Sequence, residues 1–174
     1  MNIYYLGPET YSELVAKRFK MQLVPLSNID KVVEAISKDG RGIIPYKYAD
    51  NTIHENIELM RAHGLKKIKE IRIEVKFAIG RYPKSKNYDN VYSHPIAIER
   101  CKEYLQRHYR ETTSNDVENT AEGIQQVKER REGLAIGRKD ILLKHGLEII
   151  GENIGNRNGI QTFTDFYLVK HYSN

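Results

Sequence analysis

The chain has 174 residues, of which 40% are hydrophobic and 29% are charged, and its formal net charge is +5. This composition is ordinary for a soluble globular protein with one domain or two small lobes. The single cysteine, Cys101, excludes an internal disulfide and a cysteine-rich metal site. Basic residues are spread along the chain and interrupted by acids, which favours a solvated surface over a nucleic-acid-binding face.

The N-terminal residues begin directly with a strand-like run at residues 3–6 and lack the pattern of a secretory signal peptide. No apolar run reaches the roughly 18 residues that a membrane span requires. We therefore expect a cytoplasmic protein that has neither a membrane nor a nucleic acid as its partner.

In the first half of the chain, hydrophobic periodicity alternates between the patterns of strands and helices. Strands are predicted at residues 2–6, 22–24, 42–45 and 68–79. Helices are predicted at residues 9–20, 28–39 and 55–63. Ser27 or Asn28 can cap the second helix, and Pro45 is expected to end the third strand.

The second half of the chain continues the same alternation. Strands are predicted at residues 91–92, up to about 117, at 134–136, near 147–154 and at 162–169. Helices are predicted at residues 94–105, 121–130 and 138–145. This repeating order predicts an α/β fold with mixed, mostly parallel sheets. The strands near 68–79 and 147–154 can act as crossovers, which predicts one lobe from residues 1–74 plus 151–174 and a second from 75–150.

Polar side chains follow the predicted strands at the points where helices begin. They are Thr10 and Ser12 after the first strand, Ser93 and His94 after the strand at 91–92, and Asn119 and Thr120 after the strand ending near 117. In open α/β sheets, ligands lie at the carboxyl ends of strands, and helix N-termini favour anions. A serine or threonine in such a place is more often only a helix cap. Three such places nevertheless predict an anion-binding cleft.

Patterns for metals and nucleotides are missing from the sequence. The histidines lack metal-ligand spacing, and the chain has no Walker loop. The glycines near residues 151–155 are not followed by a helix pattern, so they do not indicate a dinucleotide site. We expect no metal and no cofactor.

An ordered series of motifs covers almost the whole chain and resembles the prephenate dehydratase family. The matching segments are Gly7-Pro8-Glu9-Thr10-Tyr11-Ser12-Glu13, Ile44-Pro45-Tyr46-Lys47-Tyr48-Ala49, Ser93-His94-Pro95-Ile96-Ala97, Asn119-Thr120-Ala121-Glu122-Gly123 and Thr164-Asp165-Phe166. The resemblance implies a two-lobed fold like type II periplasmic binding proteins, with the site between the lobes. It also implies metal-free conversion of prephenate, a dicarboxylate, to phenylpyruvate, and a homodimer or larger assembly.

The resemblance further implies roles for individual residues. Thr164 is expected at the departing hydroxyl, as the catalytic residue. Ser12, Ser93 and Thr120 are expected to hold carboxylates. The full set of expected substrate-binding residues is Thr10, Ser12, Lys47, Tyr48, Ser93, His94, Asn119, Thr120, Asp165 and Phe166.

Several departures from the family pattern fall at this expected site. The family's Glu-Asn-Ser is replaced by Lys47-Tyr48-Ala49, and its Thr-Arg-Phe has become Thr164-Asp165-Phe166. The paired change predicts a charge swap, with Lys47 and Asp165 close together. The altered segment also resembles the bacilysin-type prephenate decarboxylases, which remove CO2 without expelling the hydroxyl. The bacilysin-type decarboxylases lack the regulatory ACT domain, and we expect no ACT domain in this protein either.

Three functional interpretations follow. Dehydration of prephenate ranks first because Thr164 is present. Decarboxylation without aromatisation ranks second because Lys47-Tyr48-Ala49 replaces the polar triplet. The third is a binding module for small anions, since one fold can carry several functions.

Overall fold

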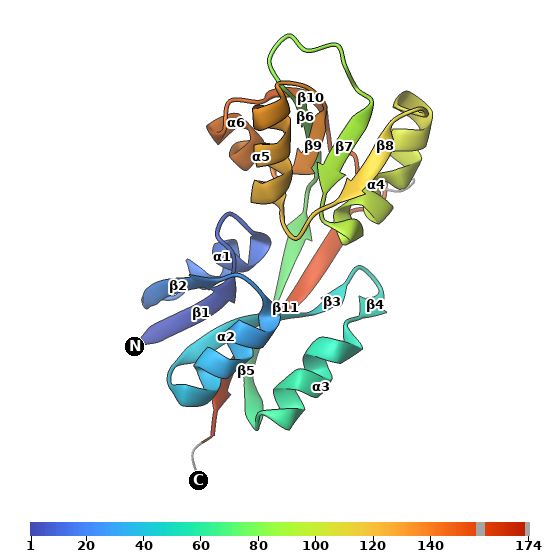
Figure 1. Ribbon diagram of the computed structural model, residues 1–174. Helices are drawn as coiled ribbons and strands as arrows, with labels where there is room; N and C mark the ends of the chain where they lie inside the picture. Colours follow the sequence, from blue (N-terminus) through green and yellow to red (C-terminus); the bar gives the residue numbers. More distant parts are fainter. Residues whose placement is uncertain (156–158, 173–174) are drawn as a thin grey trace. The chain divides into compact units, whose positions relative to one another are not determined.

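The computed structural model describes residues 1–155 and 159–172, and it divides into two compact units (Figure 1). Unit 1 comprises Met1–Val75 and the segment from Thr162 onward, and unit 2 comprises Lys76–Gln161. From the sequence, the first lobe was expected to resume at residue 151. The strand at Glu148–Glu152 instead belongs to unit 2, because it pairs with the strand at Ala78–Arg81.

Unit 1 is built on a six-stranded sheet flanked by three helices. Its elements are β1 (Asn2–Leu6), α1 (Tyr11–Ala16), β2 (Gln22–Leu26), α2 (Ile29–Lys38), β3 (Arg41–Tyr48), β4 (Asn51–Thr52), α3 (His54–Ala62), β5 (Leu65–Val75) and β11 (Thr162–His171). The strand order is β2-β1-β3-β11-β5, and β4 pairs with β3. The strands β2, β1 and β3 are parallel, whereas β11 runs antiparallel to both β3 and β5.

The two faces of this sheet bury separate hydrophobic cores. On one face, Val15 and Ala16 of α1 pack with Ile73 and Phe166 of the sheet. On the other face, residues of α2 and α3 pack with the sheet; the buried members of this cluster are Val32, Val33, Ile36, Ile44, Met60, Leu65 and Val169. Because strand side chains alternate between faces, Phe166 and Leu168 of β11 belong to the first core, and Tyr167 and Val169 belong to the second.

Unit 2 is built on a five-stranded sheet in the order β10-β6-β9-β7-β8. Its elements are β6 (Ala78–Arg81), β7 (Asn90–Ser93), α4 (Pro95–His108), β8 (Thr113–Asp116), α5 (Thr120–Arg130), β9 (Leu134–Gly137), α6 (Lys139–Lys144) and β10 (Glu148–Glu152). The strands β9, β7 and β8 are parallel, whereas β6 runs antiparallel to both β9 and β10. Within the described part of the chain, every helix is too short or too polar to cross a membrane.

The α/β order expected from the sequence is confirmed, and Asn28 is the residue that caps α2. The sheets are less parallel than expected, because β6 in unit 2 and β11 in unit 1 each run antiparallel to both of their neighbours. The predicted long strand at 68–79 is divided into β5 and β6, and the boundary between the two units falls at this break.

Two predicted boundaries were wrong. The strand β3 continues past Pro45 to Tyr48, because the register with β11 shifts at this point and the missing N–H of proline is tolerated at such a bulge. The helix α1 ends at Ala16 rather than near residue 20. The chain tightens there into turns in which Arg18 N donates to Val15 O and Phe19 N donates to Ala16 O.

A glycine on α5 sets how closely this helix approaches β7. A Cβ atom at Gly123 would lie 2.9 Å from the backbone oxygen of Tyr92. We expect Gly123→Ala to lower the free energy of unfolding by about 1–3 kcal/mol through overpacking, although alanine favours helix formation. Thermal unfolding checks this, with Lys128→Ala on an exposed position of the same helix as control. An unchanged or higher melting temperature for Gly123→Ala would contradict the close packing.

Candidate active site

In unit 1, the polar residues expected from the sequence gather at one end of the sheet. The strands β1 and β3 are parallel, so their carboxyl ends meet there. The strand β11 is antiparallel and begins at the same end, where Thr164 is the register partner of Tyr48. This end therefore carries the loop after β1, the last residues of β3 and the first residues of β11.

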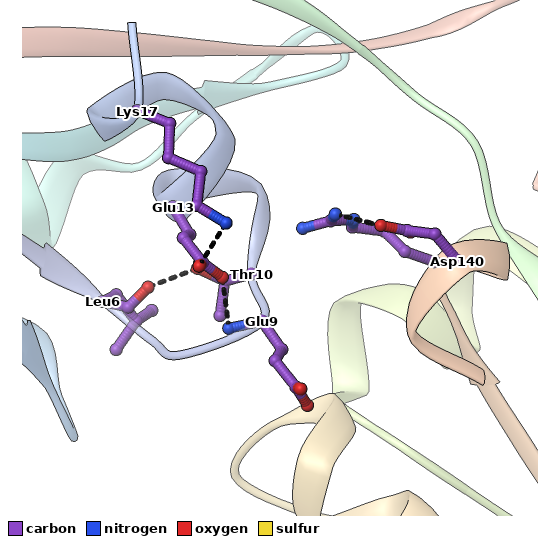
Figure 2. Close-up of polar contacts among 7 residues, drawn as sticks. Leu6, Glu9, Thr10, Glu13, Lys17 and Asp140 are labelled. Atoms are coloured by element: carbon purple, nitrogen blue, oxygen red, sulfur yellow. Dashed lines mark hydrogen bonds and ion pairs between the residues drawn. The ribbon is translucent and has the colours of Figure 1, made fainter. Parts of the chain in front are cut away.

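The loop after β1 is organised by hydrogen bonds of its own (Figure 2). The hydroxyl of Thr10 donates to Leu6 O and accepts a bond from Glu13 N at 3.3 Å, so Thr10 is the N-cap of α1. The carboxylate of Glu13 accepts a bond from Glu9 N at 2.7 Å and pairs with Lys17 Nζ at 2.6 Å. Thr10 thus holds the loop in place as a helix cap, which is the more common role of a threonine before a helix.

Thr164 faces the side of the sheet that α1 covers. Its register partner on β5 is Ile73, and directly opposed residues of neighbouring strands share a face. Ile73 packs with Val15 of α1 in the core on that side. Ser12 is buried one helical turn before Val15, so it lies on the same side as Thr164. The structure thus brings two of the expected hydroxyl residues to one face.

Phe166 was expected at the site and belongs instead to the hydrophobic core. It lies two residues beyond Thr164 on the same face, is almost completely buried, and packs with Ile71 and Leu168. Its role is to anchor β11 against α1. The assignment of Phe166 as a substrate-binding residue is therefore replaced by a role in packing.

Asp165 faces the opposite side of the sheet from Thr164, because neighbouring residues of a strand point to opposite faces. Its register partners are Lys47 on β3 and Arg72 on β5, so the three form a row across the sheet. The guanidinium of Arg72 donates from Nε to Oδ1 of Asp165 at 2.6 Å and from Nη2 to Oδ2 at 2.9 Å. The expected proximity of Lys47 and Asp165 is confirmed, but Arg72 is the residue that binds the carboxylate.

A bulge in β3 accounts for the position of Lys47. Between Asp165 and Phe166 the register moves from Lys47 to Pro45, which leaves Tyr46 as an additional residue. Tyr46 stacks on Tyr167 with ring centroids 3.6 Å apart, and Tyr167 shares the face of Asp165 by alternation. Tyr46 and Lys47 therefore both lie on the face opposite Thr164, and Tyr48 is the residue of the altered triplet that shares the face of Thr164.

The bond to Arg72 lowers the pKa of Asp165, and the charges of Arg72 and Lys47 act in the same direction against the effect of burial. A lowered pKa stabilises the folded protein above the unfolded value of about 3.9, and this contribution is lost as the pH falls through the folded value. We expect Asp165→Asn to lower the free energy of unfolding at pH 7 by about 1–3 kcal/mol. Denaturant unfolding at pH 7 and at pH 3.5 should show the deficit shrinking at the lower pH.

The matched control for this change is Glu70→Gln on β5, where an exposed carboxylate pairs with Lys67 at 3.4 Å. Exposed pairs of this kind contribute little to stability. An equal deficit for Asp165→Asn at both pH values would show that the charge of Asp165 is not what stabilises the row.

In unit 2, the carboxyl ends of β7, β8 and β9 meet at one end of the sheet, because these strands are parallel. Ser93 ends β7, is fully buried, and donates its hydroxyl hydrogen to Ile136 O on β9 at 2.8 Å. That hydrogen is therefore used to tie two strands together. A role of Ser93 in holding a carboxylate would require this bond to be exchanged.

His94 follows Ser93 and caps α4. Its Nδ1 accepts a hydrogen bond from Ile96 N at 3.2 Å, which requires this nitrogen to be unprotonated. Burial lowers the pKa of His94, and the nearby charge of Asp116 opposes that change. At neutral pH the imidazole is thus neutral, and Nε2 carries the hydrogen and can donate it to a ligand.

The first turn of α5 lies against the end of β9. Asn119 is its N-cap and accepts a bond from Glu122 N at 3.0 Å. The methyl carbon of Thr120 occupies the space above Gly137, where a Cβ atom would lie only 2.2 Å away. Gly137 therefore allows Thr120 to approach the strand end closely, whereas the side chain of Asn119 is used as a cap.

Nitrogen NMR of the imidazoles tests the state of His94. We expect its neutral form to carry the hydrogen on Nε2 and to titrate below the ordinary value of about 6.5. Because Asp116 raises the pKa, Asp116→Asn should lower it further. Titration above 6.5, or a neutral form with the hydrogen on Nδ1, would contradict the capping geometry.

Two charged residues at these strand ends were missed by the sequence analysis. Arg72 looked like one of many exposed bases of an alternating strand, and only the register with β11 pairs it with Asp165. Arg138 follows β9 directly and is buried, although it precedes a short helix in the sequence and carries no motif. Over the described ranges 1–155 and 159–172, no cluster of three or more histidine, cysteine or acidic side chains could hold a metal ion.

Comparison with known proteins identifies the family. The family model for prephenate dehydratase matches residues 3–174. The chain belongs to the prephenate dehydratase family. A prephenate dehydratase from Methanocaldococcus jannaschii is 28% identical over 165 residues, which cover 87% of this chain and 58% of that protein.

Solved structures support the fold. Prephenate dehydratase from Arthrobacter aurescens, in complex with L-Phe, matches with a TM-score of 0.82 at 17% identity, over 100% of this chain and 61% of that one. An ABC transporter structure from Parabacteroides distasonis matches with a TM-score of 0.54 at 12% identity, over 96% and 65% of the two chains. These likenesses confirm the expected α/β class of periplasmic-binding-protein type. The chain spans less than two thirds of the length of either prephenate dehydratase relative.

Proposed function

We propose that this protein converts prephenate to phenylpyruvate, CO2 and water, a step of phenylalanine biosynthesis. The observation that carries this proposal is the family match over residues 3–174, together with a threonine kept at position 164. Thr164 is buried on the face of the sheet that is covered by α1, the helix that carries Ser12. We further propose, from the family resemblance, a cytoplasmic enzyme that forms a homodimer or larger assembly.

The chemistry couples two bond cleavages. The ring carboxylate leaves as CO2, its bonding electrons enter the ring, and the ring hydroxyl departs from the opposite carbon as the ring becomes aromatic. Hydroxide is a poor leaving group, so the departing oxygen must receive one proton, and water is released. The protein therefore has to orient the substrate and to supply a hydrogen-bond donor at this oxygen.

We assign the donor at the departing oxygen to Thr164. A threonine hydroxyl both donates and accepts, so it can polarise the leaving group and relay a proton. We assign the polar donors of unit 2 to the substrate carboxylates. The best-placed donors are the Nε2–H of His94 and the hydroxyl of Thr120. Ser12 is assigned to the same anion-binding role within unit 1.

The acid at position 165 does not oppose this function. Asp165 lies on the face opposite Thr164 and is bound by Arg72. It therefore does not place a negative charge on the face to which Thr164 is assigned. Tyr48 remains the departure from the family pattern that shares the face of Thr164.

Substitution of Thr164 tests the assignment. We expect Thr164→Val to lower kcat by about 100-fold or more, since it removes the donor but keeps the shape, while Thr164→Ser keeps most of the activity. Asp165→Asn is the matched neighbour and should leave kcat within a few-fold of the unchanged protein. Full activity of Thr164→Val would remove Thr164 from the chemistry.

Product analysis separates the three functional interpretations. Purified protein is incubated with prephenate, and phenylpyruvate absorbance is followed together with CO2. Both dehydration and simple decarboxylation consume one proton, so proton uptake cannot distinguish them. Phenylpyruvate formation supports the proposal, whereas CO2 with a non-aromatic product would establish decarboxylation instead. Binding of prephenate without its loss above the spontaneous rate would indicate a binding module.

A further inference from the structure

Unit 2 carries a buried arginine at a strand end. Arg138 follows β9 directly, and its side chain is only 10% exposed. The neighbouring strand β7 ends at Ser93, whose hydroxyl bonds to Ile136 O two residues before Arg138. Thr120 packs on Gly137, the residue before Arg138. Arg138 is thus part of the end of the sheet that also carries Ser93 and Thr120.

Arg138 is paired with a carboxylate that is mainly in solvent. Its Nε donates to Oδ1 of Asp140 at 3.1 Å, and its Nη2 donates to Oδ2, so the contact is bidentate. In Figure 2, a dashed line marks the contact between the carboxylate of Asp140 and the guanidinium. The side chain of Asp140 is 63% exposed. Water can therefore replace the arginine around Asp140, whereas a buried guanidinium without an anion would be unfavourable.

The pair in unit 1 has the opposite distribution. There the acid, Asp165, is 5% exposed and the base, Arg72, is 62% exposed. A buried acid held by an exposed base leaves no buried cation for an incoming anion. In unit 2, the buried base Arg138 keeps a positive charge at the strand end. Its acidic partner Asp140 is exposed and can move into solvent.

We propose that Arg138 binds a carboxylate of the dianionic substrate, and that Asp140 occupies the guanidinium when substrate is absent. The planar guanidinium matches a carboxylate bidentately, so the substrate can take the place that Asp140 holds. The positive charge that binds the substrate carboxylate then comes from Arg138, directly after β9. The proposal rests on the proposed function for the identity of the dicarboxylate.

Paired variants test this exchange in steady-state kinetics with prephenate. Arg138→Gln should raise KM by about tenfold or more, which corresponds to the loss of one strong charged contact, with a smaller effect on kcat. Arg138→Lys should recover part of the affinity, since it keeps the charge but not the fork. Asp140→Asn removes the competing carboxylate and should lower KM or leave it unchanged.

A purely structural pair predicts a different outcome. If the two residues only stabilise the start of α6, Arg138→Gln and Asp140→Asn should both lower the melting temperature, and the folded fraction should keep the KM of the unchanged protein. That result would overturn the proposal. A rise in KM for Asp140→Asn equal to that for Arg138→Gln would overturn it as well, because Asp140 would then assist binding.

Calorimetric titration with prephenate separates this proposal from the proposed function. Binding without turnover would refute the enzymatic function but would still test Arg138, since Arg138→Gln must then weaken binding. Should Arg138→Gln fail to fold, Arg138→Lys and Asp140→Asn give the same comparison. If the unchanged protein neither binds nor converts prephenate, both proposals are overturned.

Discussion

The alternation of side chains along β11 is the constraint on which the rest of unit 1 depends. This strand lies between β3 and β5 and runs antiparallel to both, so its residues are fixed from two sides. Thr164 and Phe166 point to the core under α1, and Asp165 and Tyr167 point to the face of α2 and α3. A shift of one residue would bury the wrong set on each side, so the register is strongly specified.

This constraint changes the meaning of the motif at positions 164–166. In a linear sequence, an acid beside the expected catalytic threonine looks like a change in the site itself. In the sheet, the acid belongs to a row of charges on the other face, with Lys47 and Arg72 as neighbours. By the motif resemblance, a glutamate of the family falls at Lys47 and an arginine at Asp165, so the inverted charges keep opposite signs on neighbouring strands. A paired inversion of this kind preserves the sheet and need not alter the chemistry.

The sequence was sufficient for the order of elements and for several caps. Asn28, Thr10 and Asn119 cap their helices because a short polar side chain before an amphipathic run has few other places to bond. The sequence could not give the bulge at Pro45, because a bulge depends on how β3 pairs with β11, more than a hundred residues away. It also could not give the partner of Asp165, since Arg72 is one of several bases on an alternating strand.

The strand ends of unit 2 show why a motif alone does not define a binding group. Ser93 and Asn119 are polar and well placed, yet the hydroxyl hydrogen of Ser93 and the Oδ1 atom of Asn119 serve the fold. His94 uses one ring nitrogen as a cap and keeps the other as a donor, because burial favours the neutral ring. Arg138 has no motif, but it is a buried base paired with an exposed acid, and its proposed role rests on that arrangement. The exposure of each partner in an ion pair therefore carries information that the residue types alone do not contain.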